Sequence, residues 1–138
     1  MPTSSQAHGH TLVELCMAVG VATVLAAVAL PSYRSHQLQA GRVDAVAALT
    51  RLQMAQEQHR AAHGLYASQL SALRGVGGAS PQGRYSLAMA LTGAEAYRAT
   101  ATARPDGPQA GDRECTALTL DVVQGFAQSG PSARCWQR

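Results

Sequence analysis

The chain has 138 residues, enough for one modest domain, and its 11 basic residues, all arginine, stand against 8 acidic ones. The resulting net charge of +3 is too small to indicate by itself a nucleic-acid or membrane-surface protein. Much of the 46% hydrophobic content lies in one N-terminal block, so the remaining domain is expected to have a thin core.

Residues 11–30 form an apolar segment of 20 residues in which Glu14 is the only charged residue. As an α-helix with a rise of about 1.5 Å per residue, this segment would extend about 30 Å, the thickness of a bilayer core. The preceding residues 1–9 are polar and contain no Arg or Lys, unlike an ordinary secretory leader. The block is therefore predicted to be a membrane-spanning helix.

The apolar block is also compatible with an ordinary signal peptide. Ala27 and Ala29 form a small-x-small site at its end, and cleavage there would release a soluble secreted domain. Glu14 argues against this alternative, because a carboxylate in an apolar segment costs about 2.5 to 3.5 kcal/mol and is tolerated mainly where it has a partner. A carboxylate that reaches the membrane interface is the alternative, purely structural interpretation of Glu14.

The segment GHTLVEL at residues 9–15, followed by an apolar run that closes with Pro31, resembles the N-terminal signature of type IV pilins. Glu14 follows Gly9 by 5 positions and Pro31 follows Glu14 by 17, and both spacings match the family. The resemblance implies cleavage between Gly9 and His10 by a prepilin peptidase, N-methylation of His10 and a role for Glu14 in assembly. His10 stands where the family usually has Phe, and Pro31 is expected to end or kink the helix.

The resemblance, which is to small or minor pilins of the type IVa kind, implies three segments. These are a leader peptide at 1–9, a transmembrane and assembly helix at 10–31 and a periplasmic or extracellular globular domain at 32–138. The implied partners are other pilin subunits, the prepilin peptidase, the inner-membrane assembly machinery and, before assembly, membrane lipid. The protein would be a single-pass protein of the bacterial inner membrane and then part of a cell-surface pilus that serves adhesion or motility. A pseudopilin of a type II secretion system is an alternative.

A charge pair explains why a spanning helix would carry Glu14. After cleavage, the amine of His10 would be a cation at the end of the helix, and Glu14 of an adjacent subunit would be an anion at similar depth. Pairing the two removes two costly charges from the membrane together and sets the register of the subunits.

The rest of the chain predicts an α+β fold. Residues 32–63 have apolar residues at helical spacing, and Gly64 ends the pattern. Alternating segments at 84–91, 96–103 and 115–122, with a short one near 125–128, predict three or four strands. The order of these elements predicts one long N-terminal helix, membrane-spanning in its first half, packed against a three- to four-stranded antiparallel sheet.

Three cysteines are present, and Cys16 lies inside the apolar block. Cys115 and Cys135 are therefore expected to pair and to close a C-terminal disulfide loop, which places the domain in an oxidising compartment. The loop is either a stabilising cross-link alone or, as in pilins, also an exposed surface of the filament.

No enzyme signature stands out in the sequence. His59 and His63 are one helical turn apart, but no third ligand is evident, and solvated helix residues are the better interpretation. No phosphate-binding loop, nucleophile elbow or suggestive carboxylate pair is present. The chain is expected to be a non-enzymatic subunit that needs no cofactor and no metal.

Nucleic acid is the less favoured partner. The C-terminal tail places Trp136 between Arg134 and Arg138, and such a group can contact phosphates and stack on bases. Some minor pilins bind DNA for uptake, so a DNA-binding minor pilin is an alternative role. The preferred interpretation is that Trp136 packs beside the disulfide and that the arginines are solvated.

Overall fold

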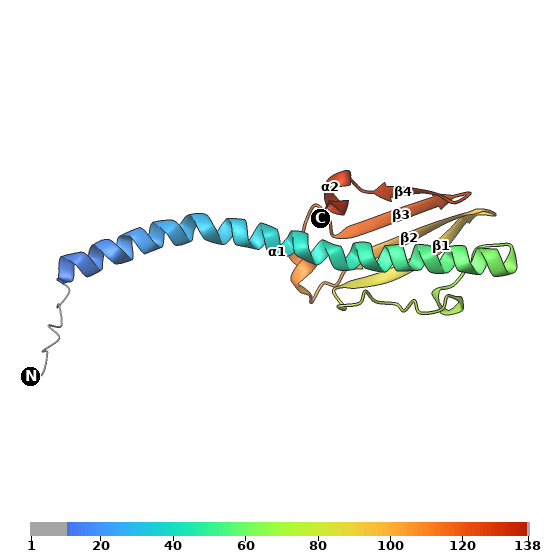
Figure 1. Cartoon of the computed structure of the whole chain (residues 1–138), viewed down its shortest axis with the longest axis horizontal. Helices are drawn as coiled ribbons and strands as arrows, with labels where there is room; N and C mark the ends of the chain where they lie inside the picture. Colours follow the sequence, from blue (N-terminus) through green and yellow to red (C-terminus); the bar gives the residue numbers. More distant parts are fainter. Residues whose placement is uncertain (1–10, 138) are drawn as a thin grey trace, which may run out of the picture. The chain divides into compact units, whose positions relative to one another are not determined.

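The computed structural model describes residues 11–137 (Figure 1). The predicted leader, the cleavage site at Gly9 and His10, and Arg138 lie outside the described residues. The chain divides into two compact units, Met1–Ser35 and His36–Arg138.

Helix α1 comprises Leu12–His63 and contributes to both units. Thr11 caps its start, because its hydroxyl accepts a hydrogen bond from the Glu14 amide at 3.3 Å, and Glu14 in the first turn is favourable to the helix dipole. Pro31 lies inside α1, so the proline does not end the helix. At the other end, Gly64 has a φ of 79°, the left-handed conformation in which helices commonly end.

Four strands follow and form an antiparallel sheet in the order β1-β2-β3-β4. The strands are β1 (Tyr85–Gly93), β2 (Ala96–Ala103), β3 (Ala117–Val123) and β4 (Phe126–Gly130). Two short 3-10 helices, η1 (Leu70–Ala72) and η2 (Pro108–Gly111), and the final α2 (Ala133–Trp136) lie in the connections and the tail. The predicted α+β fold with a long helix on an antiparallel sheet is confirmed.

The core of the second unit lies between one face of the sheet and the C-terminal part of α1 (Figure 1). Alternation along β1, β2 and β3 turns every second side chain toward the helix, as expected for a sheet with one covered face. The core is small and rich in alanine. Its fully or nearly fully buried members include Ala45, Ala48, Leu49, Leu52, Tyr66, Tyr85, Tyr97, Ala99, Ala101, Leu118, Leu120 and Val122.

The α1–β1 loop, residues 64–84, is attached to α1 by buried polar groups. The Asp44 carboxylate accepts hydrogen bonds from the Ser80 hydroxyl at 2.5 Å and from the Gln82 amide at 2.9 Å. The Gln56 amide group donates to the carbonyl of Ala67 and accepts from its N–H, at 3.0 and 2.9 Å. Because buried polar groups are costly without partners, these contacts hold the loop beside the helix.

The Tyr85 ring is fully buried, and its hydroxyl has no hydrogen-bond partner among residues 11–137. Burial raises the pKa of Tyr85 to about 12. The folded protein therefore keeps a proton that the unfolded chain loses near pH 10, so this residue's contribution to stability should fall by about 2 to 3 kcal/mol between about pH 10 and 12.

Tyr85→Phe should reduce the alkaline loss of stability by about 2 to 3 kcal/mol and leave stability at neutral pH unchanged or slightly higher. A further alkaline loss should remain, because burial also raises the pKa of Tyr97. Denaturant titrations of the second unit's fluorescence between neutral pH and about pH 12 would measure it. The control is Tyr33→Phe, since Tyr33 is 62% exposed. An alkaline loss that persists unchanged in Tyr85→Phe would contradict the assignment.

Candidate functional site

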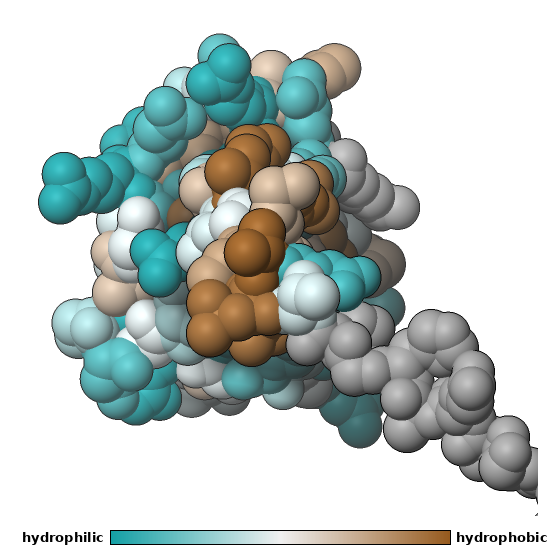
Figure 2. All heavy atoms as spheres, turned by 90° about the vertical axis from the view of Figure 1, so that its left-hand side faces the viewer, coloured by the Kyte–Doolittle hydropathy of each residue, from teal (hydrophilic) through white to brown (hydrophobic). Residues whose placement is uncertain are grey.

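The first part of α1 is an apolar surface. Residues 12–35 are all exposed, and the helix is long and apolar enough to cross a membrane. Figure 2 shows hydrophobic side chains gathered where this part of the helix faces the viewer. The large exposed side chains are Leu12, Val13, Leu15, Met17, Val19, Val21, Val24, Leu25, Val28, Leu30 and Tyr33.

The polar residues Thr23 and Glu14 lie within this apolar segment. The Thr23 hydroxyl donates to the carbonyls of Val19 and Gly20 at 2.7 and 2.9 Å, so it is satisfied within the helix. Glu14 lies in the first turn of α1. Its expected partner, the amine of His10, lies outside the described residues.

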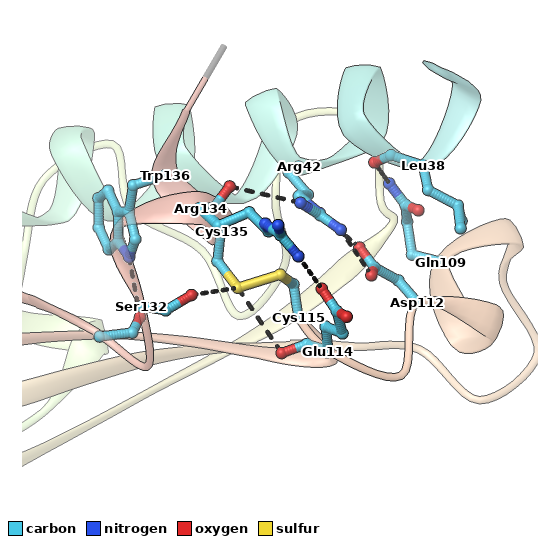
Figure 3. Close-up of a disulfide and its surroundings, with 11 residues drawn as sticks. Leu38, Arg42, Gln109, Asp112, Glu114, Cys115, Ser132, Arg134, Cys135 and Trp136 are labelled. Atoms are coloured by element: carbon cyan, nitrogen blue, oxygen red, sulfur yellow. Dashed lines mark hydrogen bonds and ion pairs between the residues drawn. A yellow bond between two sulfur atoms is a disulfide. The ribbon is translucent and has the colours of Figure 1, made fainter. Parts of the chain in front are cut away.

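The C-terminal region is held by a disulfide between Cys115 and Cys135, whose Cα atoms are 5.6 Å apart (Figure 3). The predicted disulfide loop is confirmed, and Cys16 is free. The sequence separation of 20 corresponds to about 3 kcal/mol of stabilisation in the chain-entropy model, a large share for so small a core.

A paired arginine connects α1 to this region. Arg42 donates from Nε and Nη2 to the two carboxylate oxygens of Asp112 at 2.7 and 2.8 Å, and from Nη1 to the Arg134 carbonyl at 3.4 Å (Figure 3). The hydrogen bonds to Asp112 raise the pKa of Arg42 above its usual value. Sequence reasoning missed this pair, because 70 positions separate the two residues and no local pattern joins them.

Two of the three residues that the sequence suggested as possible DNA contacts in the tail already have internal partners. Arg134 forms an exposed ion pair with Glu114 at 3.4 Å. The Trp136 indole N–H donates to the Gly130 carbonyl at 2.8 Å, and the ring packs half-buried against the core (Figure 3). Arg138 lies outside the described residues. The contacts of Trp136 favour a structural role.

A second basic surface lies between α1 and the α1–β1 loop, and we call it the basic groove. It consists of two adjoining hollows, one with a volume of about 310 Å³ and the other of about 360 Å³, which share Ala55, Gln58 and Arg74. The lining residues are Arg51, Met54, Ala55, Gln58, His59, Ala62, His63, Ala72, Leu73, Arg74 and Gly75, and this lining includes no carboxylate.

The arginines of the groove differ from most others in the described chain. Arg42, Arg60, Arg98, Arg104 and Arg134 each form an ion pair with a carboxylate. Within residues 11–137, the side chains of Arg51 and Arg74 form neither an ion pair nor a hydrogen bond. Both are exposed. They are therefore available for an external anion.

Sequence reasoning did not find the basic groove. Arg51, Gln58, His59 and His63 recur at helical spacing, and this pattern could have marked one basic face of α1. The position of Arg74 opposite that face depends on the course of the α1–β1 loop, for which the sequence has no periodic signal.

Comparison with known proteins places the chain in a family. No curated protein matches it. A family model described as "Type IV minor pilin ComP, DNA uptake sequence receptor" matches residues 31–119, more than half of the chain. The expected resemblance to type IV pilins is thereby confirmed, on residues that share only Pro31 with the N-terminal signature at 9–31. The chain belongs to the ComP family of type IV minor pilins.

Proposed function

We propose that this chain is a membrane-anchored minor pilin, which a prepilin peptidase cleaves after Gly9 and which joins a type IV pilus through α1. The observation that carries the proposal is the apolar first part of α1, exposed over residues 12–35, with Glu14 as its one charged residue before Arg34. The pilin-type signature at 9–31 and the family match from residue 31 onward rest on almost entirely different residues. They support the same role.

In this proposal, lipid covers the apolar helix in the inner membrane before assembly, and neighbouring pilin helices cover it afterwards. The transfer is favourable only if no charge is left unpaired in the apolar bundle, because an ionisable group there costs several kcal/mol. Glu14 and the new amine of His10, which the family methylates, neutralise each other between subunits. The assembly machinery of the inner membrane and other pilins are therefore the main partners, and the family match favours a pilus over a type II secretion pseudopilus.

N-terminal sequencing of the mature protein tests the anchor. We expect the mature chain, isolated from membranes and from sheared pili, to begin at His10. A mature chain that begins at Leu30 would instead show signal-peptide cleavage after Ala29 and would remove the anchor together with the proposed assembly. A Gly9→Val variant, which alters the cleavage site and leaves the helix intact, is the matched control and should remain uncleaved in the membrane.

A second candidate function is DNA reception during uptake, and the basic groove favours it. The groove offers two arginines without internal partners in a lining free of carboxylates. Unpaired arginines beside one another are suited to successive phosphates, since they release counterions without first breaking an ion pair. The family description names a DNA uptake sequence receptor, which agrees with this role.

Removing the two groove arginines should weaken DNA binding and its salt dependence. For the full chain in detergent, we expect Arg51→Ala/Arg74→Ala to reduce the slope of log affinity against log salt by about two units. Fluorescence anisotropy with a labelled duplex at several salt concentrations measures this.

The matched control removes the same charge elsewhere. Arg98→Ala/Arg104→Ala deletes two exposed arginines that already pair with Asp121 and Asp106, so the slope should change little. If Arg134→Ala/Arg138→Ala abolishes binding and the groove variant does not, the DNA site lies in the C-terminal tail. Equal effects of the groove variant and the control would indicate nonspecific attraction by net charge.

A further inference from the structure

We infer that His59 and His63 form with Arg74 a phosphate-binding subsite of the basic groove that is occupied only when the imidazoles are protonated. The inference rests on the proposed DNA function for its biological ligand. The expected ligands are phosphate groups of a polyanion, and the affinity of the subsite for them depends on pH.

The two imidazoles form one unit on α1. Their ring centroids are 4.2 Å apart with an angle of 21° between the ring planes. Nδ1 of His63 lies 3.0 Å from the His59 carbonyl oxygen, so the Nδ1–H form donates this bond. Nε2 of His63 is then an acceptor in the neutral ring and a charged donor in the imidazolium form.

The surroundings of the pair are cationic. Both rings line the 310 Å³ hollow, and Arg74 lines it from the segment after η1. Gln58, Ala55, Ala62, Ala72 and Leu73 complete this lining, so Arg74 is the one other charged residue in it.

The nearby carboxylate on α1 is engaged elsewhere. Glu57 accepts a hydrogen bond from the Tyr66 hydroxyl at 3.0 Å and lies 4.0 Å from Arg60. Neither Glu57 nor Arg60 is among the lining residues of the hollow. The described chain therefore supplies no anion inside the hollow that could neutralise a protonated histidine pair.

This arrangement links proton uptake to anion binding. Two stacked imidazolium rings repel each other, and Arg74 adds to the repulsion. A bound phosphate relieves it and accepts charge-assisted hydrogen bonds from the rings. Proton uptake therefore strengthens phosphate binding, and by reciprocity phosphate binding strengthens proton uptake. Histidine changes its charge between about pH 8 and 5, so the affinity should rise as the pH falls through that range.

DNA binding at two pH values tests the inference, with the full chain in detergent and a labelled duplex at constant ionic strength. We expect binding about tenfold tighter at about pH 5.5 than at about pH 8, and a salt slope steeper by up to about two units at the lower pH. His59→Gln/His63→Gln should lose this pH dependence. His36→Gln, which alters an exposed histidine outside the groove, should retain it.

A second probe separates this inference from the DNA function. Inorganic pyrophosphate should shift the ring NMR signals of His59 and His63, but not those of His36, and should do so at about pH 6 and not at about pH 8. If pyrophosphate gives these shifts and the duplex does not bind, the phosphate subsite is supported and the proposed DNA function is refuted. Duplex binding that is independent of pH, or that remains pH-dependent in His59→Gln/His63→Gln, overturns the subsite and leaves the DNA function. Failure of both probes overturns both.

Discussion

Replacing Glu14 with alanine is expected to reduce incorporation of the chain into pili by about 100-fold, while cleavage after Gly9 and membrane insertion continue. The physical reason is the unpaired amine of His10 that the variant would carry into an apolar helix bundle, at a cost of about 2.5 to 3.5 kcal/mol. Insertion itself should become easier, because the variant helix no longer carries a carboxylate into the lipid. Immunoblots of sheared pili against the membrane fraction measure the ratio.

Two further variants at position 14 distinguish the effect of losing the negative charge from the effect of losing side-chain volume. Glu14→Asp keeps the carboxylate and should retain part of the incorporation, whereas Glu14→Gln keeps the size and should fail nearly as severely as alanine. Thr11→Ala removes the cap of α1 from the same region and should cost only about 1 kcal/mol of helix stability. Wild-type incorporation of Glu14→Ala or Glu14→Gln would refute the proposed pairing.

Gly41→Ala is expected to destabilise the second unit by about 3 kcal/mol, although alanine is the better helix former. Gly41 lies inside α1, and a Cβ atom built there overlaps the side-chain amide of Gln109. That amide is buried and donates to the Leu38 carbonyl at 3.1 Å (Figure 3). The added methyl group would displace the amide from its buried position and break this hydrogen bond. Chemical denaturation followed by the fluorescence of Trp136 measures the change.

A double-mutant cycle tests this explanation. In a Gln109→Ala background the overlap no longer exists, so Gly41→Ala should stabilise by about 1 kcal/mol, the ordinary helix preference for alanine over glycine. Gly20→Ala is the matched control, because a Cβ atom at Gly20 meets nothing within 4 Å among the described residues. If Gly41→Ala destabilises the Gln109→Ala background as strongly as it destabilises the wild type, the clash is not the cause.

Patterns among residues close in sequence were sufficient to predict most of the fold. Helical spacing predicted α1 after Pro31, and alternation predicted three or four strands, at positions within a few residues of the four observed. The resemblance of residues 9–31 to the N-terminal signature of type IV pilins predicted the family. Such features are recognisable because a helix repeats every 3.6 residues and a strand every two, so their signals lie within a short window.

The candidate binding site was harder to predict from the sequence than the fold, as the C-terminal tail illustrates. Arg134, Trp136 and Arg138 drew attention as an aromatic residue between two cations. In the structure, Trp136 donates a hydrogen bond to the Gly130 carbonyl, and Arg134 forms an ion pair with Glu114. Sequence alone reports which residues are basic, but not which of them already have an internal partner.

By itself the sequence determined the apolar helix, the order of the elements and the cysteine pairing, because local periodicity and composition encode them. Only the tertiary structure decided three other features: Arg42 pairs with Asp112, Gly41 makes room for Gln109, and Arg74 lies across the groove from His59 and His63. Each joins residues on α1 to residues in a later connection. Contacts of this kind depend on how loops without a repeating pattern pack against a helix, and the free energy that selects them comes from burial and from the pairing of polar groups distant in the chain.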